Sequence, residues 1–236
     1  MCGRATLATP PDDLARLFGL EPPAASAVSS TPRYNIAPTD PVAVIRRTAT
    51  GGRALGMMRW GLVPSYAKAV GEGPLLINVR VESLGTKRPY RDALASRRCL
   101  VVMDGFYEWT HGTPRTPRYI RRRDRQPMAM AGLWDAWRGG GEASEERLES
   151  CTIVTVPSTP PVSTIHDRMP LLVALDLIDE WLDPSRTTTT DLTHVLEARP
   201  LEDELESYTV HPRVNAVGED HPENIEPFEL QRTLFG

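Results

Sequence analysis

The sequence predicts an α+β fold in which an antiparallel, barrel-like β core is flanked by peripheral helices. Short runs rich in β-branched and aromatic residues dominate the chain, and strands and helices do not alternate regularly. Proline occurs 22 times in 236 residues, which indicates many ordered turns and few long helices. Because there is no internal repeat and the length suits one large core, we expect residues 1–236 to form a single domain.

The first quarter of the chain predicts a helix followed by a hairpin. Thr9 as N-cap, prolines and acidic residues in the first turn and Gly19 at the end indicate a helix over residues 10–18. Residues 21–32 are rich in Pro, Ala and Ser and are expected to form a surface loop. Residues 42–47 and 54–60 read as two strands around a turn at residues 50–52.

The rest of the chain is expected to be mainly sheet. The predicted strands are residues 99–103, 118–123, 128–134, 151–156 and 208–214. The predicted helices are residues 89–97, 175–182 and 191–198. The Gly139-Gly140-Gly141 stretch is interpreted as the tip of a hairpin rather than as a linker between domains.

Composition excludes several classes of protein. Apolar residues make up 40% and charged residues 25%, as in ordinary globular chains. No apolar run approaches the ~18 residues of a membrane span, and the N-terminus has no signal-peptide core, so we expect a cytoplasmic protein without a membrane partner. Cys2, Cys99 and Cys151 are not in zinc-ligand or disulfide-framework patterns, and no metal or cofactor is expected.

Charge divides along the chain. Residues 1–139 contain 21 basic and 11 acidic side chains, whereas residues 140–236 contain 6 and 20. Of the basic residues 25 are Arg, whose planar guanidinium suits phosphate groups. The basic half is compatible with a phosphate-binding face and equally with ordinary solvated surface; the acidic half suggests only a solvated surface.

The position of Cys2 next to Met1 gives it unusual reactivity. Its small side chain permits removal of Met1, which would leave a free α-amine beside the thiol. The ordinary pKa values of these groups are about 8 and about 8.5, so both have a nucleophilic form near neutral pH. Such an aminothiol condenses with an aldehyde, first to an imine and then to a five-membered thiazolidine ring. The alternative is a disordered terminus whose second residue happens to be cysteine.

Three polar residues lie in apolar surroundings and need partners if they are buried. Asn78 follows the apolar run 74–77, Glu108 lies among aromatic residues, and His166 follows Ile165. Desolvation would raise the pKa of Glu108 into a range useful for acid/base catalysis, and histidine titrates near neutrality. Taken singly, Asn78 is also typical of a turn, Glu108 of an ion pair with Arg, and His166 of a hydrogen-bonded core histidine.

Six motifs in order resemble the SRAP family, the SOS response-associated peptidases now understood as abasic-site processing proteins. They span nearly the whole chain: Met1-Cys2-Gly3-Arg4, Arg33-Tyr34-Asn35-Ile36-Ala37-Pro38, Trp60-Gly61-Leu62-Val63-Pro64, Ile77-Asn78-Val79-Arg80-Val81-Glu82, Asp104-Gly105-Phe106-Tyr107-Glu108-Trp109 and Ile165-His166-Asp167-Arg168-Met169-Pro170. The resemblance implies one α+β domain with a groove for single-stranded DNA, in which N-terminal Cys2 is cross-linked to an abasic deoxyribose as a thiazolidine.

The resemblance also implies a role for each matching residue. Asn78 would orient the Cys2 amine, Glu108 would act as acid and base, and His166 would assist sugar ring opening and reversal of the cross-link. The implied DNA contacts are phosphate contacts from Arg4, Arg80, Arg88 and Arg168, with Asn35, Pro38 and Thr155 lining the same groove and little base preference. Trp60, Tyr66 and Trp109 are candidates for stacking on bases or shaping the groove, and each could equally be a core residue. The partner would be single-stranded DNA with abasic sites, bound in the cytoplasm at the nucleoid.

One departure from the family concerns an aromatic pair. A bacterial member of the family carries two adjacent tryptophans where this chain reads Pro64-Ser65-Tyr66-Ala67-Lys68. Because one base–aromatic stack is worth about 1–3 kcal/mol, we expect weaker or reoriented binding of flanking DNA with the cross-linking chemistry intact.

Other functions remain open from the residues alone. The opening Met-Cys-Gly is shared with glutamine amidotransferases that use an N-terminal nucleophile. A cysteine peptidase built on Cys2, His166 and Asn78 would match the older family name, with Met1 removal as its peptidase-like event. A non-catalytic single-strand binder is the fourth possibility, and cross-linking and lyase turnover are not separated by the sequence.

Overall fold

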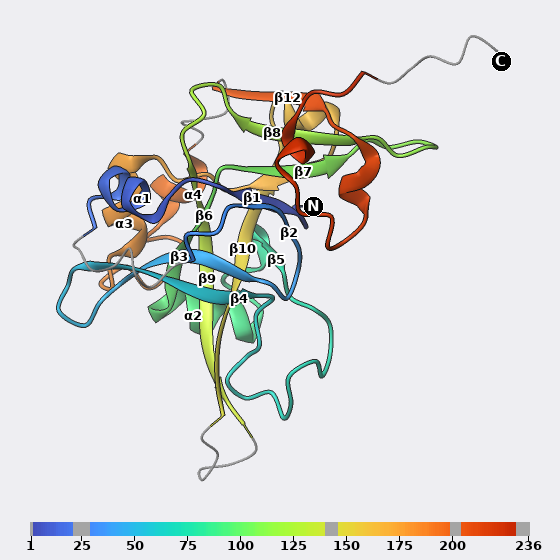
Figure 1. Ribbon diagram of the computed structural model, residues 1–236. Helices are drawn as coiled ribbons and strands as arrows, with labels where there is room; N and C mark the ends of the chain where they lie inside the picture. Colours follow the sequence, from blue (N-terminus) through green and yellow to red (C-terminus); the bar gives the residue numbers. More distant parts are fainter. Residues whose placement is uncertain (1, 21–28, 140–145, 199–203, 230–236) are drawn as a thin grey trace.

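A closed five-stranded barrel forms the centre of the computed structural model, which describes residues 2–20, 29–139, 146–198 and 204–229 (Figure 1). Around the barrel the neighbouring strands are β10 (Arg147–Pro157), β4 (Arg53–Trp60), β3 (Pro41–Arg47), β6 (Arg98–Met103) and β9 (Met128–Arg138), and β9 pairs with β10 to close it. Two short strands, β5 (Asn78–Arg80) and β11 (Arg168–Pro170), extend the sheet on β10.

A second sheet of five strands lies beside the barrel (Figure 1). Its order is β12 (Leu205–Thr209), β8 (Pro117–Arg122), β7 (Gly105–Trp109), β1 (Ala5–Leu7) and β2 (Arg33–Ile36). The first residue of β7 is Gly105, and only glycine fits there because a Cβ would overlap the Tyr119 hydroxyl. Thr6 bonds the same hydroxyl at 2.7 Å, so Tyr119 ties β1, β7 and β8 together.

The helices are short and peripheral, as the proline content predicts. The α-helices are α1 (Pro11–Phe18), α2 (Arg88–Ser96), α3 (Ile178–Leu182) and α4 (Thr193–Glu197). The 3₁₀ turns are η2 (Val81–Ser83), η3 (Val162–Thr164), η4 (Leu175–Leu177), η5 (Pro212–Asn215) and η6 (Pro222–Ile225). In the described residues no helix is long and apolar enough to cross a membrane.

The α+β, barrel-like prediction is confirmed, and several details differ: among them, β1, β2, β5, β7 and β11 were not predicted. Pairing is mixed, because β10 runs parallel to β4 and β5. Thr9 does not cap α1: its hydroxyl donates to Asp104 at 2.7 Å, and the helix begins at Pro11. The strand expected over 208–214 ends at Thr209, because Pro212 starts η5 and the His211 ring accepts the Arg213 N–H.

Two predicted features fall partly outside the described residues. Residues 21–28 of the expected surface loop are not described. The same holds for residues 140–145, although the Gly139 N–H donates to the Glu146 carbonyl at 2.9 Å and Arg138 pairs with Arg147. β9 and β10 therefore approach this segment as the two arms of a hairpin.

Candidate functional site

Cys2 is fixed where the second sheet meets the barrel. It precedes β1 and is fully buried. β1 pairs antiparallel with β7 through Ala5 and Phe106, and the Tyr107 N–H donates to the Arg4 carbonyl at 3.0 Å. Continued toward the N-terminus, this register brings Cys2 alongside the end of β7, where Glu108 lies.

Asn78 reaches the same place from the barrel side. Its side-chain amide nitrogen donates to the Cys2 carbonyl at 2.7 Å. The other amide atom, Oδ1, is buried and has no hydrogen-bond partner within the described parts of the chain. β5 holds Asn78 opposite Ile153 of β10, so a rigid strand positions the amide. Asn78 thus offers an acceptor next to the backbone of Cys2.

Glu108 is 3% exposed, and burial raises the pKa of its carboxyl, while the nearby His166 ring acts in the opposite direction. Burial first, and then the Glu108 carboxylate, raise the pKa of the Cys2 thiol. Glu108 therefore interacts electrostatically with both Cys2 and His166. Together with the Asn78 hydrogen bond, these electrostatic interactions indicate that the four residues predicted as catalytic lie near one another.

His166 follows η3 and is held by its backbone neighbours. Its Nδ1 accepts the Arg168 backbone N–H at 3.0 Å. The same Nδ1 lies 2.9 Å from Asp167 Oδ1, a contact that becomes an ion pair only when the ring is protonated. The Ser158 hydroxyl donates to the His166 carbonyl at 2.6 Å and fixes the loop.

His111 is a residue of this site that the sequence did not single out. Its ring stacks on that of His166, with centroids 6.0 Å apart. It is exposed and follows Glu108 by three positions, just beyond β7. In the sequence, only its position just after the Glu108 motif could have indicated that His111 belongs to the site.

Arg4 and Asn35, predicted as DNA contacts, bind the η5 region in this structure. Arg4 donates to Asn35 Oδ1 and to the Val214 carbonyl, both at 2.7 Å. The Asn35 amide donates to the Ala216 and Glu219 carbonyls at 3.0 and 2.9 Å, and Asn35 is 2% exposed. The two residues anchor the segment after β12 against β2.

Trp60 and Thr155 lie in the core, and for Trp60 this is the alternative that the sequence left open. Trp60 is fully buried, cannot stack on a base, and donates through Nε1 to the Ile77 carbonyl at 3.1 Å. Thr155 is also fully buried and donates to the Val79 carbonyl at 3.2 Å. The two acceptor carbonyls belong to Ile77 and Val79, the residues on either side of Asn78. Trp60 and Thr155 therefore help to fix the backbone at Asn78.

Arg168 is also engaged within the protein. It is 8% exposed, its guanidinium binds both Glu82 carboxylate oxygens at 2.8 and 3.0 Å, and it donates to the Thr155 carbonyl at 2.6 Å. This clamp links the turn after β5 to the strand after His166. Phosphate contact would require Arg168 to give up Glu82.

The remaining predicted DNA contacts lie at or near the surface. Arg80 is exposed and lies on the same face of β5 as Asn78, two positions along. Tyr66 is 50% exposed and carries the Arg88 guanidinium 4.4 Å from its ring centroid. Trp109 is half-buried and donates to Asn215 Oδ1 at 2.7 Å, and Pro38 is half-buried.

Metal ligation finds no support in this cluster. Across residues 2–20, 29–139, 146–198 and 204–229 no group of three His, Cys, Asp or Glu side chains is placed to hold a metal ion.

Sequence comparison supplies relatives for the whole chain. A family model described as SOS response associated peptidase (SRAP) matches residues 1–217. The abasic site processing protein YoqW of Bacillus subtilis (strain 168) is 35% identical over 228 residues, which cover 96% of this chain and 99% of the relative. The abasic site processing protein HMCES of Gallus gallus is 32% identical over 233 residues, covering 84% and 67%.

Solved structures share the fold. A Bacteroides thetaiotaomicron protein from a structural genomics programme has a TM-score of 0.81 at 19% identity, covering 97% of this chain and all of its own. A phage-related protein of Bordetella bronchiseptica has a TM-score of 0.68 at 30% identity, covering 89% of this chain and 94% of its own.

Proposed function

The chain belongs to the SOS response associated peptidase (SRAP) family, and from its site we propose that it captures abasic sites in single-stranded DNA as a covalent link to Cys2. The observation that carries the proposal is the convergence of Cys2, Asn78, Glu108 and His166. The relatives' names as abasic site processing proteins support the same substrate.

The proposed reaction begins at the α-amine of Cys2 after Met1 has been removed. The amine attacks the C1′ aldehyde of the ring-opened deoxyribose, and the carbinolamine loses one water to give an imine. The thiol then adds to the imine carbon, forming the C–S bond of a thiazolidine, while the thiol proton ends on the ring nitrogen. The sum is one aldehyde and one aminothiol giving one thiazolidine and one water.

Glu108 is suited to the proton transfers of this sequence. Burial raises the pKa of Glu108 and so favours the protonated carboxyl, the form that can protonate the departing hydroxyl of the carbinolamine. The carboxylate left behind can accept the thiol proton and return it to nitrogen. Asn78 Oδ1 is an acceptor for an amine N–H, and a protonated His166 ring, paired through Nδ1 with Asp167, can give its Nε2 proton to the sugar ring oxygen as the ring opens.

The electrostatics favour amine-first chemistry over a thiolate nucleophile. Cysteine peptidases and thiol-dependent amidotransferases need a thiol whose pKa is lowered. Burial and the Glu108 carboxylate raise the pKa of the Cys2 thiol, which opposes formation of a thiolate nucleophile.

Single-stranded DNA is the proposed substrate because the reacting groups are buried. Cys2 and Glu108 are 0% and 3% exposed, so the abasic sugar must turn out of the strand to reach them. That displacement costs least where the flanking nucleotides are not held in a duplex.

The test uses the Cys2→Ser variant, which keeps the α-amine and lacks the thiol. With abasic single strands we expect wild type to form a heat-stable cross-link without reductant, and Cys2→Ser to form one only when cyanoborohydride reduces the imine. A heat-stable link from Cys2→Ser without reductant would contradict the ring closure. Failure of both proteins to be trapped would contradict the amine as nucleophile.

A further inference from the structure

The proposed reaction leaves the ring of His111 without a role, although this ring lies on that of His166. The two imidazoles are stacked, with centroids 6.0 Å apart and planes inclined by 28°. Aromatic rings at such separations attract one another in offset, face-on arrangements. His111 is exposed, whereas the side chain of His166 is 20% exposed. His111 therefore packs on His166 from the solvent side.

The turn that joins β7 to β8 holds His111 in this place. The Thr110 N–H donates to the Thr116 carbonyl at 3.0 Å, and the Thr116 N–H donates to the Thr110 hydroxyl at 3.1 Å. These bonds close the turn directly at His111. Gly112 follows with φ +118°, a conformation that suits glycine, so the chain bends immediately after His111. The His111 backbone is therefore fixed relative to β7, the strand that carries Glu108.

Stacking restrains a different property of His166 than its hydrogen bonds do. The ring atom Nδ1 accepts the Arg168 backbone N–H at 3.0 Å and lies 2.9 Å from Asp167 Oδ1. A contact at one atom fixes that atom better than it fixes the plane of the ring. A second ring packed against the face restrains the plane itself. His111 is thus placed to hold the direction in which the His166 ring presents Nε2.

The direction of this ring matters for the first step that the abasic sugar must undergo. A closed deoxyribose has no aldehyde for the Cys2 amine to attack. Opening breaks the bond between C1′ and O4′, adds a proton to O4′ and removes the proton of the C1′ hydroxyl, which leaves the aldehyde. The atoms balance without a co-reactant. The proton donor must face O4′ for this step to be assisted.

We propose that His111 is a positioning residue, which assists opening of the sugar by holding the His166 ring in the direction that this proton transfer needs. The inference rests on the proposed function, because it takes His166 as the proton donor. His111 acts through its aromatic face and not through its own charge. Once the aldehyde has formed, His111 has no further part, and the later steps depend on Cys2, Asn78 and Glu108.

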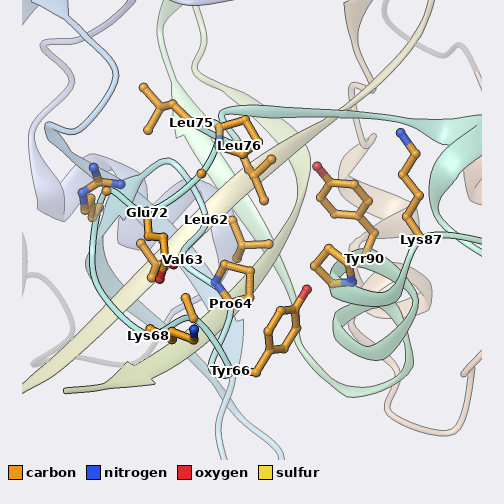
Figure 2. Close-up of a pocket in the computed structure, with 16 residues that line it drawn as sticks. Leu62, Val63, Pro64, Tyr66, Lys68, Glu72, Leu75, Leu76, Lys87 and Tyr90 are labelled. Atoms are coloured by element: carbon orange, nitrogen blue, oxygen red, sulfur yellow. The ribbon is translucent and has the colours of Figure 1, made fainter. Parts of the chain in front are cut away.

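This role is separate from the surface at which the sequence predicts binding of flanking DNA. That surface includes Tyr66, which lines a cavity of about 640 Å³ between the loop after β4 and the start of α2 (Figure 2). Neither His111 nor His166 is among the described residues that line this cavity. Loss of His111 should therefore lower the cross-linking rate at saturating DNA and leave affinity for a tetrahydrofuran-containing strand unchanged. Lower affinity with an unchanged rate at saturation would overturn the inference.

Two single-stranded substrates separate ring opening from the later steps. One carries a natural abasic site, and the other carries at the same position an acyclic residue with a pendant aldehyde, which periodate releases from a diol before the protein is added. This second residue has no hydroxyl that can close onto the aldehyde. At saturating DNA, His111→Ala should slow cross-linking of the natural site about tenfold or more and keep cross-linking of the acyclic aldehyde within about twofold of wild type. Equal slowing on both substrates, or no slowing on either, would overturn the inference.

His166→Ala is the reference for the same pair of substrates. It should show the same selective slowing, because the proposed role of His111 acts through His166. A normal rate of His166→Ala on the natural site would overturn the inference at its donor.

Three further variants separate stacking from charge. His111→Phe keeps a flat ring without a titratable nitrogen, and His111→Lys keeps a cation without a ring. On the natural site His111→Phe should retain about half or more of the wild-type rate, and His111→Lys should be as slow as His111→Ala. His194→Ala removes another exposed histidine, which pairs with Glu180, and should match wild type.

The outcomes distinguish this inference from the proposed function. Failure of His111→Phe to retain the rate, or a normal rate for His111→Lys, would overturn the stacking role while Cys2 capture stands. Absence of a cross-link from wild type with both substrates would instead refute the proposed function.

Discussion

The side-chain amide of Asn78 donates a 2.7 Å hydrogen bond to the backbone carbonyl of Cys2, while its Oδ1 is buried without a partner in the described residues. One amide thereby fixes the backbone of the proposed nucleophile and leaves an acceptor beside it. The contact joins β5 of the barrel to the chain that enters β1 of the second sheet. Cys2 is therefore positioned by both sheets.

Replacing Asn78 by Asp tests this positioning. The variant keeps an oxygen but loses the N–H that donates to the Cys2 carbonyl, so the amine is no longer held in place. We expect the cross-linking rate at saturating abasic DNA to fall by about 10²-fold, as small misplacements of reacting groups commonly do. Affinity for a tetrahydrofuran-containing strand should stay within twofold. A loss of affinity with an unchanged rate would mean that Asn78 binds DNA.

Glu108 should make stability depend on pH. Burial raises its pKa in the folded protein above the unfolded value, so its contribution to stability is fully present below the unfolded pKa and is lost as pH rises through the folded pKa. The Glu108→Gln variant has no carboxyl to ionise, so it does not lose this stability as pH rises. We expect the Tm of Glu108→Gln to match that of wild type at acidic pH and to exceed it increasingly as pH rises.

Glu82→Gln is the matched control for that experiment, because Arg168 lowers the pKa of Glu82. Its contribution is present above the unfolded pKa and lost as pH falls, so the sign is opposite. A Tm difference for Glu108→Gln that does not vary with pH would contradict the raised pKa.

The chemistry of the site could be predicted from the sequence because it follows from the residue types themselves and not from their tertiary contacts. An aminothiol at position 2 and a carboxyl among aromatic residues have their properties wherever they fold. The contacts of Arg4 and Asn35 with residues 214–219 could not be predicted, since about 180 or more residues separate the partners. The parallel pairing of β10 with β4 and β5 is likewise set by tertiary packing rather than by local pattern.

The sequence around a residue was ambiguous where that residue type suits more than one role. Thr9 had the sequence context of an N-cap, but the Asp104 carboxylate takes its hydroxyl. Trp60 resembled a stacking residue by type alone, and only the barrel shows that it is enclosed.

Arg80 and Arg168 should respond differently to substitution by Gln. Arg80 is exposed beside Asn78, so if it contacts a phosphate its loss should reduce the slope of log K against log salt by about 0.7 for a single strand.

Arg168 is clamped by Glu82 and the Thr155 carbonyl, so its loss should lower the free energy of unfolding by about 1–3 kcal/mol.

Glu82→Gln separates the two possible roles of Arg168. If Arg168 is a clamp, the variant should not bind single-stranded DNA more tightly. Tighter binding with a steeper salt dependence would indicate that Glu82 had been competing with phosphate for the guanidinium.

Trp60→Phe tests the reassignment of Trp60 from DNA to the core. The variant loses the hydrogen bond to the Ile77 carbonyl, which still accepts the Ile153 N–H, and it leaves a small void. We expect the free energy of unfolding in urea to fall by about 1 kcal/mol or more, with affinity for undamaged single strands unchanged. Reduced affinity at unchanged stability would restore the stacking role.

The central claim is tested most directly by a denaturing gel of the Met1-processed protein with single-stranded DNA that carries one abasic site, run beside Cys2→Ala and beside intact DNA. The account predicts a slow, heat-stable band for wild type with abasic DNA, and no such band for Cys2→Ala or for intact DNA. Absence of the band from wild type, with Met1 removal confirmed by mass spectrometry, would contradict covalent capture through Cys2.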